Sequence, residues 1–401
     1  MEPTTPNEII TTIKLLKPKA SSGYDEISVK FIQSCSLNSL AKPLSHIINT
    51  SFQTGIFPTN MKLSKVIPIY KSNDPQHFKN YRPISLLPAF SKIIEKIVYK
   101  RLFRFISLHN ILSPSQYGFQ ENLSTQLAIL ELQNKIVKAM NDNKSCIGLF
   151  IDLAKAFDTL NHSILLEKLC NYGIRGLSLQ WFRSYLQDRY QFVKYKNVNS
   201  EHEQVTCGVP QGSILGPLLF LLYINDVMHI NNSHHIILFA DDTNCLFTGN
   251  NIEDLVQQIN SSIRNLSEWF RTNKLSLNID KSNYVIFHKK QSSSITNNHT
   301  IKIDDKELSQ VNHVKFLGVL LDANMTWNIH LTQKANKIAK VNGILCRLKH
   351  YLPSYILKTI YDTLILPHLY YSITAWGNLK TRTTKRIIIL QKKVHSYNFK
   401  C

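Results

Sequence analysis

The sequence predicts a protein of mixed helix and strand (α+β) that is divided into two or three structural units. Its 401 residues are 43% hydrophobic, which is enough to bury a sizeable core and too much for a disordered chain. Stretches with the apolar spacing of helices occur together with short, mostly apolar runs that favour strands. Both kinds of element are therefore expected along most of the chain.

The charge of the chain indicates its class of partner. There are 47 Lys and Arg against 27 Asp and Glu, a formal net charge of +20. An excess of this size favours a polyanion, and nucleic acid is the favoured one. An anionic membrane surface would also attract the chain, but the sequence has no signal peptide after Met1, no lipidation motif and no apolar run of spanning length. We therefore expect no membrane partner.

Cysteine usage points to the redox environment. Seven cysteines are scattered without CxxC pairs, and their odd number argues against a disulfide framework. The 15 histidines do not pair with cysteines at the spacing of zinc ligands. This pattern fits an intracellular, reducing compartment.

The part of the chain before the first strand is expected to be helical. Helical spacing covers residues 28–55, is broken at Pro43 and is closed by Gly55. The other elements expected in this region are an amphipathic stretch, a strand and a polar loop, at 7–17, 65–71 and 72–80.

Apolar spacing predicts a helix over 91–106, and its other face is basic. Four cations recur there every four residues: Lys92, Lys96, Lys100 and Arg104. Like charges at this spacing repel by a few tenths of a kcal/mol per pair, roughly, in an isolated helix. A phosphate backbone would turn that cost into a gain, and an ordinary solvated face explains the stripe equally well.

Two acidic features mark the middle of the chain. A mostly apolar strand at 146–153 delivers Asp152 near its end, an unusual place because an unpaired buried charge is costly. The apolar run 235–248 is interrupted by Asp241 and Asp242, which predicts a β-hairpin with both residues at its turn. A bound divalent cation would relieve the repulsion between the two carboxylates. A solvated turn is the plain alternative, since Asp is a favoured turn residue.

The remaining patterns predict further helices, turns and strands. Helices are expected at 124–140, 162–170, 215–227, 253–270, 330–349 and 355–364, with the start of another at 386–393. A rigid turn rich in Gly and Pro is expected at 208–213. Strands are expected at 284–288, 301–303, 306–308 and 314–321, and a disordered loop at 291–300. The strands at 301–303 and 306–308 flank Asp304 and Asp305, which suggests a second hairpin.

Three carboxylates stand out from this survey: Asp152, Asp241 and Asp242. They could meet if their strands are neighbours in one sheet. Phosphoryl transfer with two divalent ions roughly 3.5–4 Å apart needs acidic oxygens that bridge both ions. Two or three Asp side chains can supply them, so we expect a metal-dependent phosphoryl-transfer site.

An ordered set of motifs resembles those of reverse transcriptases from non-LTR (LINE-like) retrotransposons, particularly the jockey-like mobile elements. In family order, the matching segments are a fingers motif at 81–85, three palm motifs at 150–158, 208–217 and 239–242, a fourth motif at 275–281, and a primer grip at 316–318. An Asp-Asp hairpin alone is a weak signal. The ordered set is specific, and it covers nearly the whole chain.

The resemblance implies a right-hand polymerase fold, with an antiparallel palm sheet, helical fingers and a partial helical thumb. The implied domains are an N-terminal helical extension at 1–61, a reverse transcriptase domain of fingers and palm at 62–321, and the start of a truncated thumb at 322–401.

The resemblance also implies roles for individual residues. Asp152, Asp241 and Asp242 would be catalytic and would bind two Mg²⁺ ions. The nucleotide-binding residues would be Lys71, Arg82, Phe157, Gln211, Gly212 and Lys281, and the primer grip would be Phe316, Leu317 and Gly318. In this scheme Phe157 lies under the incoming sugar and Lys281 is a candidate general acid. Without the resemblance, Phe157 would be interpreted as a core residue, and Lys71 and Lys281 as surface cations.

The implied function is that of an RNA-directed DNA polymerase, which adds deoxynucleotides to a primer 3′-hydroxyl by two-metal phosphoryl transfer. Its partners would be an RNA template, a DNA primer and deoxynucleoside triphosphates, and the family acts in the nucleus. The alternative is a catalytically inactive, nucleic-acid-binding remnant of the same kind of element. The sequence does not indicate an oligomeric state.

Overall fold

The computed structural model describes residues 1–230, 235–289, 300–378 and 382–395. The chain forms two compact units, each built from three separate segments. Unit 1 comprises Met1–Phe119, Leu153–Ile230 and Glu268–Leu277, and unit 2 comprises Gln120–Asp152, Asn231–Ser267 and Asn278–Cys401. The predicted mixture of helices and strands is confirmed in both units. The predicted domain boundaries, at residues 61/62 and 321/322, stay predictions.

Unit 1 begins with three helices, α1 (Pro6–Leu15), α2 (Val29–Ser34) and α3 (Leu37–Thr54). The predicted break at Pro43 is wrong, because Pro43 lies inside α3 and the helices are separated at Cys35 and Ser36. Proline removes one hydrogen-bond donor, but the buried apolar face of α3 offsets that loss. Gly55, with φ of 68°, ends α3 as predicted.

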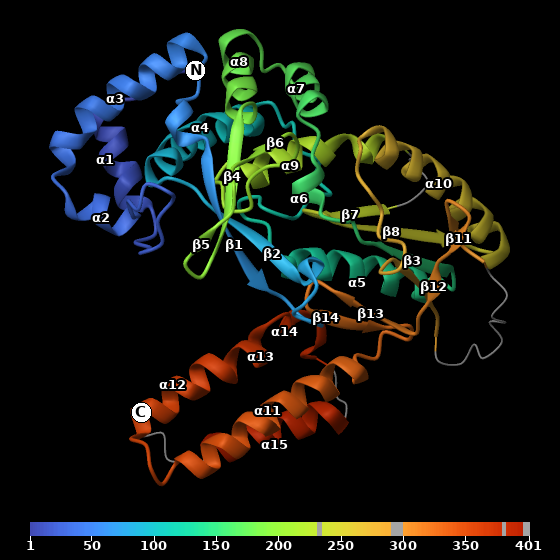
Figure 1. The fold of residues 1–401 in the computed structure, drawn as a ribbon. Helices are drawn as coiled ribbons and strands as arrows, with labels where there is room; N and C mark the ends of the chain where they lie inside the picture. Colours follow the sequence, from blue (N-terminus) through green and yellow to red (C-terminus); the bar gives the residue numbers. More distant parts are fainter. Residues whose placement is uncertain (231–234, 290–299, 379–381, 396–401) are drawn as a thin grey trace. The chain divides into compact units, whose positions relative to one another are not determined.

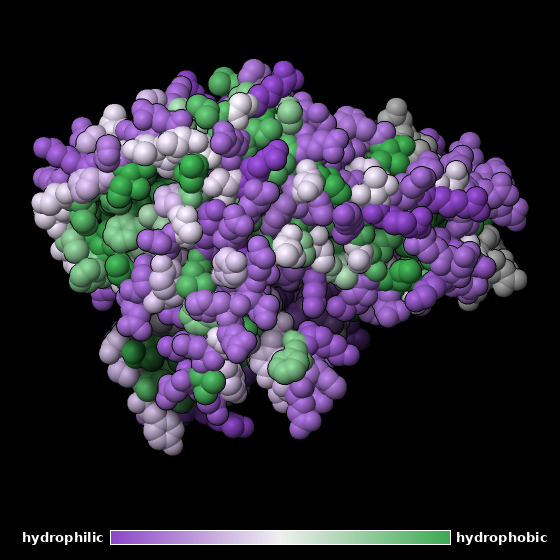
Figure 2. All heavy atoms as spheres, turned by 45° about the horizontal axis from the view of Figure 1, so that its top comes forward, coloured by the Kyte–Doolittle hydropathy of each residue, from purple (hydrophilic) through white to green (hydrophobic). Residues whose placement is uncertain are grey.

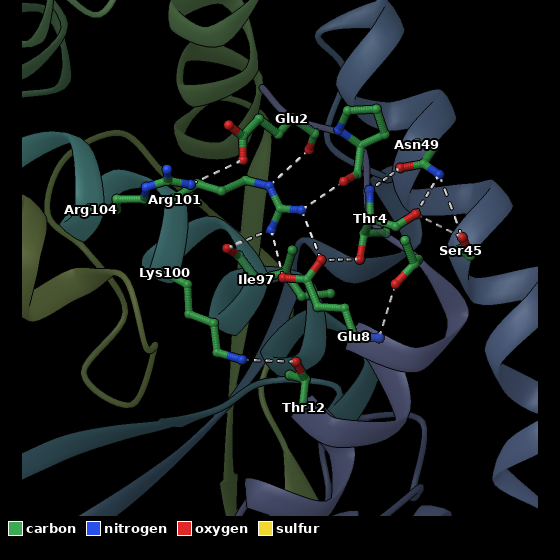
Figure 3. Close-up of polar contacts among 12 residues, drawn as sticks. Glu2, Thr4, Glu8, Thr12, Ser45, Asn49, Ile97, Lys100, Arg101 and Arg104 are labelled. Atoms are coloured by element: carbon green, nitrogen blue, oxygen red, sulfur yellow. Dashed lines mark hydrogen bonds and ion pairs between the residues drawn. The ribbon is translucent and has the colours of Figure 1, made fainter.

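The N-terminal segment is fastened to helix α4 (Ala89–Leu108), as Figure 3 shows. The Arg101 guanidinium donates to both carboxylate oxygens of Glu8, at 3.0 and 2.9 Å, and to the backbone carbonyl of Glu2 at 2.8 Å. Lys100 donates to Thr12, and Arg104 lies 3.7 Å from the Glu2 carboxylate. Two of the four cations of the basic stripe predicted on this helix, Lys100 and Arg104, therefore contact the N-terminal segment.

Unit 1 also contains a five-stranded sheet in the order β2-β1-β4-β5, with β6 paired to β4 (Figure 1). Its strands are β1 (Leu63–Tyr70), β2 (Tyr81–Leu86), β4 (Arg189–Tyr195), β5 (Val198–Asn199) and β6 (Glu203–Val205). Strands β1 and β4 are parallel and the other pairs are antiparallel. The helices of this unit that follow α4 are α6 (Ala156–Thr159), α7 (His162–Asn171), α8 (Gly176–Leu186), α9 (Gly216–Ile224), and the 3₁₀ helix η3 (Asn225–His229).

Unit 2 is built on a second five-stranded sheet, in the order β12-β9-β3-β8-β7 (Figure 1). Its strands are β3 (Ser145–Ile151), β7 (His235–Phe239), β8 (Asp242–Gly249), β9 (Asn283–Phe287) and β12 (Ser309–Gln310). All neighbours are antiparallel except β12 and β9. The central strand β3 is almost entirely buried, and helix α5 (Thr125–Asn141) packs on it. Helix α10 (Ile252–Thr272) follows β8 and its last turns belong to unit 1.

Two small hairpins follow in unit 2. β10 (Lys302–Ile303) and β11 (Lys306–Glu307) flank Asp304 and Asp305, which confirms that predicted hairpin. The single strand predicted at 314–321 is wrong, because the segment is a hairpin of β13 (His313–Phe316) and β14 (Val319–Asp322). Its two-residue turn has φ of 42° at Leu317 and 85° at Gly318, and glycine adopts the second value without strain.

The rest of unit 2 is helical. Its helices are α11 (Asn328–Leu348), α12 (Ser354–Leu364), α13 (Leu366–Tyr370), α14 (Ile373–Trp376) and α15 (Arg382–His395). The sequence patterns did not predict α13 and α14, and α15 begins four residues earlier than expected. The predicted disordered loop at 291–300 lies outside the described residues except for Thr300.

One face of the molecule is drawn in Figure 2 with its hydropathy. The face drawn in Figure 2 is mostly hydrophilic, and its apolar side chains lie in scattered groups. Within the described ranges, the helices are all too short or too polar to cross a bilayer.

Candidate active site

The three predicted catalytic aspartates all belong to unit 2, at one end of its sheet. Ile151 of β3 pairs with Thr243 of β8, so Asp152 and Asp242, the next residues outward, lie opposite each other. Phe239 pairs with Asp242 across the β7-β8 hairpin. The turn therefore consists of Ala240 and Asp241. The prediction that both aspartates form the turn is wrong for Asp242, which begins β8.

Backbone conformation in this hairpin also differs from the expectation. The positive φ that a tight turn requires, 55°, is adopted by Ala240 and not by an aspartate. Ala240 is buried, so the alanine side chain packs inward while the turn carries Asp241. The turn thus buries a small side chain directly before the two acids.

The carboxylates are close enough to influence each other. Loss of hydration, followed by the negative charges of Asp241 and Asp152, raises the pKa of Asp242 from its ordinary value to about 6. Clustered acidic oxygens are the donors that hard divalent cations prefer. However, the described residues contain no group of three or more His, Cys, Asp or Glu side chains arranged as a ready metal-binding cluster. The donor chemistry thus fits a divalent cation, whereas a closed set of ligands is not formed.

Asp152 is held by a turn that follows α10. Asn278 Nδ2 donates to Asp152 Oδ2 at 2.9 Å, and the Asn278 amide donates to the Asp152 carbonyl at 2.8 Å. The Asp152 amide in turn donates to Ser282 Oγ at 3.1 Å. Neither Asn278 nor Ser282 was predicted from the sequence as a site residue, although the motif at 275–281 includes Asn278. Lys281 lies in the same turn with an exposed side chain.

In unit 1, the glycine turn at 208–213 meets two other predicted site elements. The Val209 amide donates to the Phe157 carbonyl at 2.9 Å, and the Ser85 amide of β2 donates to the Gln211 carbonyl at 2.9 Å. Gln211 Nε2 donates to Asp158 Oδ1 at 2.8 Å, so its side chain is also held. The structure therefore brings Phe157, Gln211 and Gly212 together, with Asp158 as a partner that sequence analysis did not single out.

A buried carboxylate lies beneath the same turn. Glu95 of α4 is fully buried, and its Oε2 accepts hydrogen bonds from the amides of Ile214, at 2.6 Å, and Leu215, at 3.3 Å. These amides precede α9, where the helix dipole favours a negative charge. Burial nonetheless raises the pKa of Glu95. No sequence signal singled out this acid, since its position within an apolar helix looks like an ordinary interruption.

Phe157 is packed among aromatic rings. Its ring stacks on Phe220 with centroids 4.5 Å apart and meets Phe119 edge to face at 6.5 Å. These contacts give it a packing role in unit 1. The predicted contact with the incoming sugar stays a prediction.

Lys71 and Arg82 belong to the β1-β2 hairpin of unit 1. Arg82 pairs with Ile69 in the sheet register, and the Lys71 amide donates to the Asn80 carbonyl at 2.8 Å, just beyond the paired strands. Both side chains are exposed to solvent. The hairpin thus presents two cations, as expected, and their contact with a triphosphate stays a prediction.

The predicted primer grip forms the turn of the β13-β14 hairpin in unit 2. Tyr371 donates its hydroxyl to the Leu317 carbonyl, and its ring covers Gly318 so closely that a side chain there would meet it at 3.3 Å. The Tyr371 carbonyl is itself bound by Lys334 Nζ at 3.2 Å and by Trp376 Nε1 at 3.1 Å. The C-terminal helices therefore hold this turn in place, which no sequence motif indicated.

Comparison with known proteins is consistent with this assembly of motifs. A sequence family described as reverse transcriptase (RNA-dependent DNA polymerase) matches residues 69–321, more than half of the chain. The chain therefore belongs to the reverse transcriptase family.

Its relatives are proteins of mobile elements without long terminal repeats. It is 28% identical to the probable RNA-directed DNA polymerase from transposon BS of Drosophila melanogaster, over 98% of this chain and 44% of that protein. It is 29% identical to the corresponding protein from transposon X-element of the same species, over 98% and 43%. It is 26% identical to the RNA-directed DNA polymerase from mobile element jockey of that species, over 96% and 42%. The chain thus spans less than half the length of these relatives, and the predicted resemblance is confirmed.

Proposed function

We propose that this chain is an RNA-directed DNA polymerase of a non-LTR retrotransposon, which adds deoxynucleotides to a primer 3′-hydroxyl on an RNA template. The observation that carries the proposal is the end of the unit 2 sheet, where Asp152 and Asp242 lie opposite each other beside Asp241. Family membership supports the same activity. Within a right-hand polymerase fold, the sheet of unit 2 would be the palm, the β1-β2 hairpin part of the fingers, and the C-terminal helices part of the thumb.

Individual residues of the chain are proposed to have separate roles in metal binding, nucleotide binding and proton transfer. Asp152, Asp241 and Asp242 would hold two Mg²⁺ ions, and Asn278 would keep one oxygen of Asp152 in a fixed direction. When bound, two such ions activate an attacking hydroxyl and stabilise the leaving phosphate oxygen. Lys71 and Arg82 would bind the triphosphate, Arg82 as a planar donor and Lys71 as a mobile charge. Lys281 is proposed as the general acid for the leaving pyrophosphate.

Template and primer would be held mainly through their phosphates. The net charge of +20 supports this mode of binding, because each neutralised phosphate releases counterions whatever the sequence. Phe316, Leu317 and Gly318 are proposed to contact the primer, in the turn that Tyr371 supports. Phe157, Gln211 and Gly212 are proposed to contact the nucleotide sugar and base.

The experiment compares primer extension by wild-type protein and Asp241→Asn, with a primed RNA template, labelled deoxynucleotides and Mg²⁺. We expect Asp241→Asn to abolish extension, because the substitution removes a charged metal ligand and keeps the shape of the side chain. The chain offers a matched control in its second Asp-Asp hairpin, at Asp304 and Asp305. Asp305→Asn alters that turn in the same way, and Asn tolerates its φ of 65°, so extension should be retained.

The outcomes separate the candidate functions. Extension by wild type and Asp305→Asn but not by Asp241→Asn supports the proposal. Extension retained by Asp241→Asn would refute the metal assignment. RNA binding by the wild type without any extension would favour the nucleic-acid-binding remnant.

A further inference from the structure

The loop between β1 and β2 in unit 1, residues 71–80, presents one aromatic side chain almost completely to solvent. Phe78 is 94% exposed, the largest value for any large apolar side chain in the described ranges. Single exposed apolar residues are ordinary on protein surfaces. The exposure of Phe78 therefore needs to be judged against how the loop is built and what surrounds it.

The loop is closed by its own hydrogen bonds. The Lys71 amide donates to the Asn80 carbonyl at 2.8 Å, and Asn80 Nδ2 donates to the Asp74 carbonyl at 2.7 Å. The hydroxyl of Tyr81 donates to the Pro75 carbonyl at 2.9 Å. Phe78 itself begins a single 3₁₀ turn, Phe78–Asn80. The aromatic ring is therefore presented by a loop with its own internal hydrogen bonds, in which Asn80 is buried.

The surroundings of the ring are basic. Lys71, Lys79 and Arg82 are all exposed, and the one acid of the loop, Asp74, already accepts a hydrogen bond from the Gln76 amide and lies 3.5 Å from His77. An exposed aromatic ring in a basic loop is what single-stranded nucleic acid binds, since the phosphates meet the charges and a base stacks on the ring. A duplex hides its base faces and would use the charges alone.

We propose that Phe78 is a stacking platform for an unpaired base of single-stranded nucleic acid, with Lys79, its neighbour in the chain, binding a flanking phosphate. The choice of nucleic acid as the polyanion rests on the proposed function. The stacking role goes beyond it, because catalysis does not require this ring. The aromatic pair of Tyr70 and Tyr81, in edge contact at 5.6 Å, stiffens the base of the loop and keeps the platform in place.

The first test measures affinity by fluorescence anisotropy with a labelled single-stranded RNA. Phe78→Ala should weaken binding roughly 10-fold, the effect of losing one base-stacking contact. The matched control is Phe31→Ala, which removes another exposed phenylalanine of unit 1, 60% exposed, and should leave the affinity unchanged. Equal affinities of the two variants would overturn the proposal. Because Phe78 makes no buried contact, its replacement leaves the fold intact, and circular dichroism verifies this.

The second test identifies what lies on the ring. In Phe78→Trp the new indole should be quenched by single-stranded RNA, because a stacked base quenches it, and not by heparin, which supplies charge without bases. Anionic phospholipid vesicles form the third arm, since a membrane surface would also accept an aromatic ring flanked by lysines. Quenching by vesicles or heparin but not by RNA would overturn the proposal. Neither test needs polymerase activity, so failure of extension and failure of stacking are separate results.

Discussion

Gly212 is a position in unit 1 at which a single added methyl group should be strongly destabilising. Its φ is +147°, and a Cβ added to it would overlap the carbonyl oxygen of Ser85. Ser85 is buried and cannot yield easily, because it is paired with Val66 of β1 and its amide donates to the Gln211 carbonyl at 2.9 Å. Gly212→Ala must therefore distort the glycine turn, the strand or both.

The expected loss in the free energy of unfolding follows from these contacts. A strained backbone conformation costs about 1–3 kcal/mol, and the loss of the hydrogen bond between Ser85 and Gln211 costs about 1 kcal/mol more. Alanine also lowers the conformational entropy of the unfolded chain, which stabilises the folded state by roughly 0.4–1 kcal/mol. Gly212→Ala should therefore lower the free energy of unfolding of unit 1 by roughly 1–3.5 kcal/mol.

The control is Gly343→Ala in helix α11, where an added Cβ meets nothing within 4 Å. This variant should stabilise unit 2 by about 0.5–1 kcal/mol through helix propensity. Urea denaturation read by hydrogen-exchange mass spectrometry reports the two units separately. If Gly212→Ala unfolds within about 0.5 kcal/mol of wild type while the control behaves as expected, the argument from the close approach of Ser85 is wrong.

Two further predictions concern unit 2. Burial lowers the pKa of Lys334 to about 8. Between pH 8 and 10.5 the unfolded chain, whose lysine has the ordinary pKa, therefore binds more protons than the folded chain. The free energy of unfolding should rise with pH across this range, by at most about 3 kcal/mol. Lys334→Met should remove that rise, and denaturation at pH 8 and pH 10 measures it; equal slopes in the two proteins would contradict the assignment. Tyr371→Phe removes the donor to the Leu317 carbonyl and should speed amide exchange in the β13-β14 turn roughly 5-fold, about 1 kcal/mol. Tyr355→Phe, at an exposed tyrosine, is the control, and equal exchange in both variants would mean that the hydroxyl does not hold the turn.

Strong local signals in the sequence were read correctly. The β7-β8 and β10-β11 hairpins, the helix end at Gly55 and the long helices α5, α10 and α11 depend on periodicity, turn residues and caps that lie within one segment. The errors arose where local rules compete with burial. Pro43 is tolerated inside α3 because that helix buries an apolar face, and the run 314–321 bends at Leu317 and Gly318 although its apolar residues resemble one strand.

In the candidate site, too, some features could be predicted from the sequence and others required the folded structure. Residue type and order were enough to find Asp152, Asp241 and Asp242 and to suggest that they act together, because carboxylate chemistry and motif order are properties of the sequence. Partners far apart in the chain required the folded structure: Asn278 lies 126 residues from Asp152 and Glu95 lies 119 residues from Ile214. Such contacts arise from packing between elements, and no spacing in the sequence encodes them. The sequence therefore determined the chemistry of the hairpin at Asp241 and Asp242, and the tertiary structure alone decided which side chains hold its partner Asp152 in position.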